Sequence, residues 1–433
     1  MTRQELASNL AISLTSAAWS PGNIARHFYR RLPNAVQRLS EDLSVELFAE
    51  CPRIYAPSPK IVAIALLRTY GFERIFRYCQ RRGIWPDPDL AEPKMAPIAE
   101  FSRLELPEIP TVNALADWLM LPVEKVEYFA DRSSRHERHG ETSVNHYFYA
   151  LRRKKSHGTR LIEAPKPTLK SIQRRILSGI LDQVPVHRDA FGFVRGRNCV
   201  RAAARHSSEQ LVVRFDLKNF FPTVGTGRVF GLFRCLGYPH AVAASLSGLC
   251  TTRTPHRILE RMNVIDRKFY REVHLPQGAP TSPSLANHIT FALDRRLGSL
   301  ARSLEANYSR YADDLTFSGD RGICATLLKV VPEIVRDEGL YLNHQKTQIL
   351  SRSSRQLVTG IVVNDHINIS RRKYDQIKAT IHACGKPGDR RIFDPVFRSR
   401  LIGKIGWVET VNQNRGWKLR QKLASVINDR MKI

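Results

Sequence analysis

The amino-acid sequence predicts a mixed α/β (α+β) fold, in which a small sheet carries acidic side chains and helices stand before and after it. Residues 212–221 are apolar and β-branched and contain Asp216, which is typical of a buried strand. Residues 307–318 alternate apolar and polar side chains around Asp313 and Asp314, which predicts a β-hairpin with the Asp pair at its turn. Apolar residues at helical spacing near both ends of the chain predict flanking helices.

The overall charge indicates a polyanionic partner. The 433 residues include 68 Lys and Arg against 40 Asp and Glu, a formal net charge of +28. Such an excess favours nucleic acid or an anionic membrane surface. No stretch approaches the ~20 apolar residues that a membrane span requires. The seven cysteines stand singly, without a Cys-x-x-Cys pair, which predicts reduced thiols in a bacterial cytoplasm. Nucleic acid is therefore the expected partner, and no membrane association is expected.

Residues 1–105 are expected to form a helical N-terminal extension. Residues 61–67 and the aromatic and aliphatic side chains after them recur at helical spacing. A proline-rich stretch, residues 85–97, then marks a linker. Histidines in and after this region lack carboxylate partners at ligand spacing, so they predict no metal site. No chemistry is assigned to the extension.

Two short helices, at residues 111–119 and 123–129, should lead into a strongly basic stretch. Residues 151–205 hold fourteen Lys and Arg against three acids. A solvated helix face could account for such a run. Strand character around Gly158 instead predicts a hairpin, which would display Lys154 and Arg160 to phosphate groups.

Asp216, Asp313 and Asp314 are the candidate metal ligands. An Asp pair at a turn is by itself more often solvated, because Asp favours turns. A second strand that delivers a carboxylate changes this interpretation. Two Mg²⁺ ions about 3.5–4 Å apart need hard oxygen ligands in order to stabilise attacking and leaving oxygens. Asp216 and Asp313 are 97 residues apart (313 − 216), so only a fold that pairs their strands brings them together.

Between these strands, residues 275–287 form a Gly- and Pro-rich loop that opens into a helix near Pro283. A helix N-terminus suits a phosphate or a template backbone. Near the chain end, residues 371–433 carry sixteen Lys and Arg against five acids, with apolar residues at helical spacing. This pattern predicts basic helices that grip a nucleic-acid duplex.

Three motifs together resemble the palm of reverse transcriptases nearly letter for letter. They are Phe-Asp-Leu-Lys-Asn-Phe-Phe at 215–221, Pro-Gln-Gly-Ala-Pro-Thr-Ser-Pro at 276–283 and Tyr-Ala-Asp-Asp at 311–314. Residues 154–177 and 191–198 are similar to the fingers motifs of bacterial members, and Val358-Thr359-Gly360 is similar to a hallmark of the retron type. The resemblance covers about 145–430. It implies a right-hand polymerase, with N-terminal helices and fingers at 106–215, a palm at 216–350, and a primer grip and helical thumb at 351–433.

The resemblance also implies roles for individual residues. Asp216, Asp313 and Asp314 would be catalytic and bind two Mg²⁺, with Mn²⁺ as a substitute, and the Leu217 carbonyl would complete one ion's shell. The incoming dNTP would contact Lys154, Arg160, Phe221, Gln277 and Lys346. Phe221 would exclude the ribose 2′-hydroxyl; the alternative is that it only packs in the core. Lys346 would act as a general acid for the leaving pyrophosphate; the alternative is that it is an ordinary surface lysine. Primer and template would contact Arg197, Gly278, Tyr311, Gly360, Arg371, Arg372 and Lys373.

The function that follows is RNA-directed DNA synthesis by two-metal nucleotidyl transfer on a structured non-coding RNA. A retron enzyme would make an RNA-linked single-stranded DNA (msDNA) in anti-phage defence, with an effector or toxin protein as a further partner. Residues 238–243, Tyr-Pro-His-Ala-Val-Ala, stand where retron enzymes carry Asn-Ala-x-x-His. Another bacterial defence-associated or diversity-type reverse transcriptase therefore stays open. A non-catalytic RNA-binding scaffold is a third alternative, against which the three intact carboxylates argue.

Overall fold

The computed structural model describes residues 1–14, 19–52, 57, 59–86, 93–131, 145–153 and 159–431. The chain divides into two compact units. The first comprises Met1–Pro185 with Phe221–Ile289, and the second comprises Val186–Phe220 with Thr290–Ile433. The chain thus passes from one unit to the other after residues 185, 220 and 289. Among the described residues, no helix is both long and apolar enough to cross a membrane.

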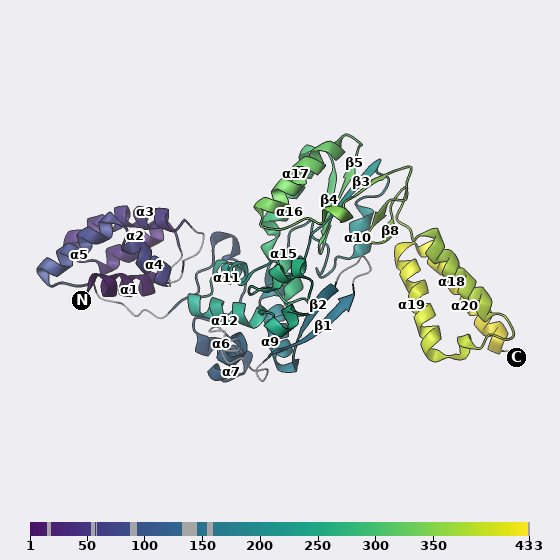
Figure 1. Cartoon of the computed structure of the whole chain (residues 1–433), viewed down its shortest axis with the longest axis horizontal. Helices are drawn as coiled ribbons and strands as arrows, with labels where there is room; N and C mark the ends of the chain where they lie inside the picture. Colours follow the sequence, from purple (N-terminus) through teal and green to yellow (C-terminus); the bar gives the residue numbers. More distant parts are fainter. Residues whose placement is uncertain are drawn as a thin grey trace. The chain divides into compact units, whose positions relative to one another are not determined.

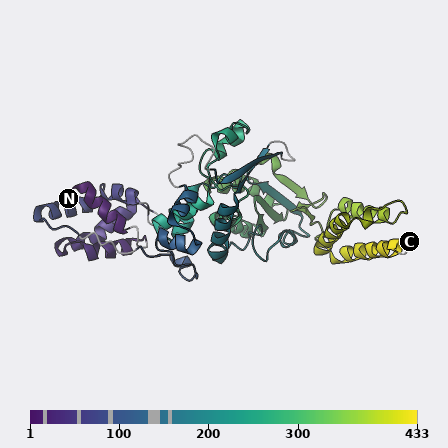
Figure 2. The same ribbon diagram turned by 90° about the horizontal axis from the view of Figure 1, so that it is seen from below.

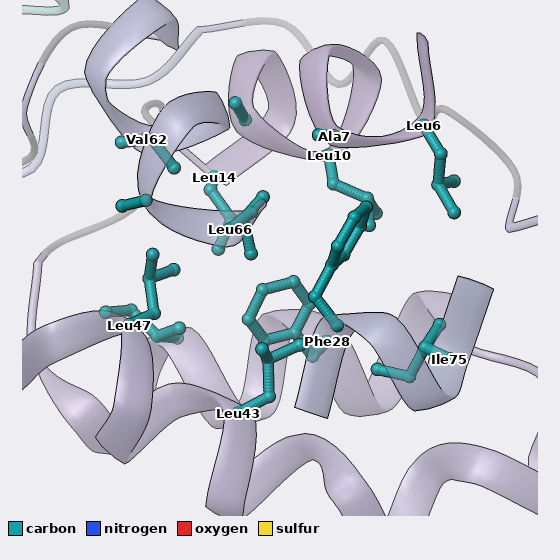
Figure 3. Close-up of a cluster of buried hydrophobic side chains, with 14 of the residues drawn as sticks. Leu6, Ala7, Leu10, Leu14, Phe28, Leu43, Leu47, Val62, Leu66 and Ile75 are labelled. Carbon is teal, nitrogen blue, oxygen red and sulfur yellow. The ribbon is translucent and has the colours of Figure 1, made fainter. Parts of the chain in front are cut away.

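The predicted helical N-terminal region is confirmed. Its helices are α1 (Arg3–Leu14), α2 (Pro21–Arg31), α3 (Ser40–Glu50), α4 (Pro59–Leu66) and α5 (Tyr70–Arg82), shown in Figure 1. The Ser20 hydroxyl accepts a hydrogen bond from the Asn23 amide and so caps α2. All five helices contribute to one apolar core, and Figure 3 shows side chains from each of them turned toward one another. This core excludes water from residues such as Phe28, Leu43 and Ile75.

The remainder of the first unit contains a β-hairpin and helices. The hairpin pairs β1 (Tyr147–Arg153) with β2 (Thr159–Pro165) in an antiparallel register, as the sequence predicts. Its apolar side chains pack against Leu259, Met262 and Tyr270. The two predicted short helices are α6 and α7, and the predicted helix near Pro283 is α15. The helices are α6 (Val112–Leu119), α7 (Val123–Ala130), α9 (Pro167–Gly179), α11 (Thr226–Cys235), α12 (His240–Cys250), α13 (His256–Leu259), α14 (Val264–Arg267) and α15 (Ser282–Ile289).

A four-stranded antiparallel sheet forms the centre of the second unit. Its strand order is β4-β5-β3-β6, so β3 has a neighbour on each side. One face of β3, with Leu211, Val213 and Phe215, is buried, whereas Arg214 and Asp216 on the other face are only partly buried. Helix α16 packs against β4 and α17. The bounds are β3 (Leu211–Asp216), β4 (Asn307–Tyr311), β5 (Asp314–Gly319), β6 (Gln348–Ser351), α10 (Cys199–Ala204), α16 (Phe291–Ser303) and α17 (Ile323–Asp337).

A short hairpin and three packed helices complete the second unit (Figures 1 and 2). β7 (Leu357–Val358) pairs with β8 (Ile361–Val362) across Thr359 and Gly360, both of which have positive φ angles. Two successive positive φ angles are characteristic of a type I′ turn, in which glycine is favoured. The helices are α18 (Arg371–Cys384), α19 (Pro395–Val411) and α20 (Gln413–Met431). The predicted basic helices are therefore confirmed as elements.

Candidate active site

Strand pairing brings the candidate carboxylates together. In the register of β3 and β5, Asp216 lies opposite Asp314. In the β4–β5 hairpin, Tyr311 pairs with Asp314, which leaves Ala312 and Asp313 as a two-residue turn. The predicted hairpin is thus confirmed, with Asp313 in the turn and Asp314 at the start of the following strand. Two segments almost a hundred residues apart in sequence meet at one end of the sheet.

Backbone hydrogen bonds hold the end of β3 between two neighbours. The Leu217 amide donates to the Asp313 carbonyl at 2.8 Å, which ties the turn to β3. On the other side, the Asn343 amide donates to the Asp216 carbonyl at 2.8 Å, and the Lys218 amide donates to the Tyr341 carbonyl at 2.7 Å. The positions of Asp216, Leu217 and Asp313 are therefore set by main-chain bonds.

Two cations lie against the carboxylates. The Lys346 ammonium donates to both carboxylate oxygens of Asp216, at 2.8 and 3.0 Å. The Arg214 guanidinium approaches an Asp314 oxygen at 3.4 Å. The sequence analysis did not select Arg214, although a charged residue two positions before Asp216 in an apolar strand is a usable signal. Lys346 was predicted at this site, and its ion pair with Asp216 brings its ammonium among the carboxylates.

The chemistry of the carboxylates suits a hard cation. Burial, together with the neighbouring charges of Asp314 and Asp216, raises the pKa of Asp313 to about 6. Burial likewise raises the pKa of Asp314, and Arg214 opposes that effect. Crowded, desolvated carboxylates of this kind are stabilised in their ionised form by a bound cation, and Mg²⁺ prefers oxygen ligands. Within the described ranges, no group of three His, Cys, Asp or Glu side chains is arranged to hold a metal ion. Lys346 pairs with Asp216, and Arg214 lies beside Asp314.

Two of the predicted nucleotide-binding residues, Arg160 and Gln277, meet at β2. Arg160 is exposed on this strand, and the Gln277 carbonyl accepts a hydrogen bond from the Glu163 amide at 2.9 Å. Gly278 has a φ of +136°, and a Cβ there would lie 3.1 Å from the Glu163 carbonyl oxygen. The loop can therefore approach the strand this closely only with glycine at 278. The structure thus brings Gln277 and Gly278 onto the strand that carries Arg160.

A buried carboxylate that the sequence analysis did not select supports this loop. Glu163 is fully buried; its carboxylate accepts a hydrogen bond from the Thr254 hydroxyl at 2.7 Å and lies 2.9 Å from His274 Nε2. Burial lowers the pKa of His274, but the Glu163 charge outweighs it and raises the pKa on balance. The only signal in the sequence is an acid within the basic stretch 151–205, which does not identify its partners.

The two phenylalanines after β3 differ in exposure. Phe220 is buried, whereas Phe221 is partly exposed. Core packing therefore accounts more fully for Phe220. The assignment of Phe221 as the residue that excludes the 2′-hydroxyl stays a prediction.

The remaining predicted contacts are spread over both units. Arg197 donates through Nη1 to the carbonyls of His187 and Ala190, both at 2.6 Å, so it supports its own loop. Arg371, Arg372 and Lys373 are exposed at the start of α18. Tyr311 is partly buried, Gly360 lies in the β7–β8 turn, and Lys154 lies outside the described residues. Template and primer contacts at these positions stay predictions.

Comparisons with known proteins agree with the motifs. A family model described as reverse transcriptase (RNA-dependent DNA polymerase) matches residues 152–378. The retron Mx65 reverse transcriptase of Myxococcus xanthus is 32% identical over 419 residues, which cover 94% of this chain and 88% of that protein. The retron Mx162 enzyme of the same organism is 37% identical over 302 residues, covering 65% and 61%. The retron Ec86 enzyme of Escherichia coli is 34% identical over 239 residues, covering 53% and 67%.

Proposed function

Because the chain belongs to the reverse transcriptase family, as an RNA-directed DNA polymerase of the retron type, we propose that it copies a structured non-coding RNA at Asp216, Asp313 and Asp314. The observation that carries this assignment is the pairing of β3 with β5, which sets Asp216 opposite Asp314. A nucleotidyl-transfer site requires carboxylates gathered in this way from separate segments. The product would be a single-stranded DNA linked to its RNA.

The oxygen donors of these aspartate side chains are of the kind that divalent cations prefer. Asp216, Asp313 and Asp314 would hold two Mg²⁺ ions, or Mn²⁺ in their place, together with the Leu217 carbonyl. The bound ions would stabilise the charge that develops on the attacking and leaving oxygens. Lys346, which pairs with Asp216 in the structure, would turn toward the pyrophosphate and act as its general acid.

Other residues would position the substrates. Arg160 and Gln277 would orient the triphosphate of the incoming dNTP, and Phe221 would exclude the 2′-hydroxyl of a ribonucleotide. Tyr311 would support the primer end, and the exposed cations of α18 would bind the RNA. Catalysis of this kind depends mainly on orientation and on neutralisation of charge.

We place the enzyme's biological role in anti-phage defence with an effector protein as partner, as part of the same proposal. The similarity to three retron enzymes supports the retron product. Residues 238–243 favour one alternative, another bacterial defence-associated or diversity-type reverse transcriptase, because they depart from the retron signature. The two alternatives differ in the nucleic acid that they make.

Sequencing of the nucleic acid that copurifies with the full chain tests the proposal. The wild-type protein should carry one hybrid RNA–DNA species, and the Asp313→Asn variant should carry the RNA without the DNA. Heterogeneous or repetitive DNA on the wild-type protein would overturn the retron product in favour of the alternative. Equal amounts of DNA on both proteins would overturn the assignment of the site.

A further inference from the structure

Arg310 is a fully buried cation directly behind the turn that carries Asp313. It lies in β4, and its side chain has no solvent exposure. Asp294 of α16, also fully buried, accepts two hydrogen bonds from it, from Nε at 2.8 Å and from Nη2 at 2.6 Å. A third donor, Nη1, reaches the Ala312 carbonyl at 3.2 Å. That carbonyl belongs to the peptide group that joins Ala312 to Asp313.

Further contacts hold both the side chain and the main chain of Arg310 in place. The Tyr308 hydroxyl donates to Asp294 at 2.9 Å, which orients the carboxylate. The ring of Phe220 lies 5.8 Å from the guanidinium carbon. The main chain of Arg310 accepts a hydrogen bond from the Phe191 amide and donates one to the Asp189 carbonyl, both at 2.8 Å. The side chain that contacts the turn therefore cannot shift without breaking several contacts.

The turn itself needs such support. Ala312 has a φ of +58°, in the left-handed region that residues with a Cβ rarely adopt. The backbone of Gly192 also lies so close that a Cβ there would be 2.5 Å from the Ala312 amide nitrogen. A left-handed residue next to a catalytic carboxylate persists only where its surroundings impose it. The Arg310 contact with the Ala312 carbonyl is one such constraint.

We propose that Arg310 and Asp294 are a positioning pair for the reaction. Asp294 fixes the guanidinium, and Nη1 fixes the plane of the peptide group before Asp313, which sets the direction of the Asp313 carboxylate. Neither residue touches substrate. This inference rests on the proposed role of Asp313. Buried ion pairs stabilise a fold poorly compared with apolar packing, so the positioning of Asp313 gives a reason for burying this pair.

The first test keeps the positive charge at position 310 but removes the planar guanidinium group with its several donors. Lysine in Arg310→Lys can pair with Asp294 but cannot also donate from a rigid planar group to Ala312. Small displacements of a reacting group lower rates by about 10²-fold. We expect kcat to fall by about 10- to 100-fold and the Mg²⁺ concentration for half-maximal activity to rise, while KM for primer–template stays unchanged.

A second variant separates positioning from stability. Asp294→Leu combined with Arg310→Met replaces the pair with apolar side chains, a change that is often neutral or stabilising. Kinetics are measured at a temperature at which circular dichroism shows each protein folded. A folded double variant with wild-type kcat and Mg²⁺ dependence would overturn the inference, as would wild-type values for Arg310→Lys.

The same helix offers a matched control. Arg296 of α16 pairs with Asp337 at 2.7 Å at the surface. Arg296→Gln combined with Asp337→Asn should leave both kcat and the Mg²⁺ requirement unchanged; a loss equal to that of the buried variants would count against a specific role for Arg310. Failure of the proposed function looks different, because Asp313→Asn would then remain active.

Discussion

Arginines of the sheet and arginines of the C-terminal helices carry the same charge in opposite surroundings. Arg310 is fully buried, with donors directed at Asp294 and Ala312. Arg371 at the start of α18 has a side chain that is 94% exposed and lies 3.7 Å from Asp375 one turn along the helix. Buried charges are fixed in direction and so determine geometry, whereas exposed charges are screened and contribute mainly to a long-range field. Changes in the first region should alter catalysis, and changes in the second should alter salt-dependent binding.

The largest effect should come from the carboxylates. Asp216→Asn and Asp313→Asn should each lower DNA synthesis by at least ~10²–10³-fold, the typical loss when one stabiliser of transition-state charge is removed. RNA affinity should stay unchanged, because it depends on exposed cations. Primer extension and filter binding measure the two quantities, with Asp42→Asn, an exposed position of α3, as the surface control. Robust extension by either variant would contradict the site.

A smaller change is expected from Phe221. Phe221→Ala should raise incorporation of rNTP relative to dNTP by about 10- to 100-fold, because a pocket that distinguishes substrates by bulk alone discriminates by this order. Single-nucleotide incorporation measures the ratio. Phe148→Ala, an exposed position of the first unit, is the control. An unchanged ratio would show that Phe221 is only a packing residue.

Cations of α18 should affect the choice of template rather than the chemistry. Replacing Arg371, Arg372 and Lys373 with Glu should weaken binding of the copurified RNA by ~10-fold or more. The same change should shift the position at which synthesis starts. Extension of a generic annealed primer should fall much less. The same reversal at Arg74, Arg81 and Arg82 of α5 controls for total charge. Equal losses on both templates would make these helices a general duplex clamp.

The smallest expected effect is a change in how steeply RNA affinity depends on salt concentration. Log affinity for RNA should fall linearly with log salt, by about 0.7–0.9 for each phosphate contact. Replacing Arg371, Arg372 and Lys373 with Gln should reduce that slope by about 2.1–2.7 if all three contact phosphates. Titrations between low and moderate salt give both values. A flat wild-type titration would mean that the excess cations only face solvent.

The local patterns in the sequence were enough to predict the elements of the site but not its charge pairs. Alternation around Asp313 and the apolar run before Asp216 predict the two strands, because such patterns depend on near neighbours. The pairs Lys346–Asp216, Arg310–Asp294 and His274–Glu163 join residues 130, 16 and 111 positions apart. Arg310 resembles any polar residue of an alternating strand, and only the packed fold shows that it is buried. Partners of this kind depend on tertiary structure, which one sequence does not reveal.

The place of β3 between β5 and β6 has a consequence for synthesis of the protein on the ribosome. β3 ends at Asp216, but β6 ends at Ser351, 135 residues later (351 − 216). At about 5–20 residues per second, roughly 7–27 s pass before the second neighbour exists. During that time the mainly apolar sequence Leu-Val-Val-Arg-Phe has at least one unpaired edge, a state that is prone to aggregation. Nascent chains stopped between residues 216 and 351 should therefore bind chaperones, and that binding should end once β6 has emerged from the ribosome.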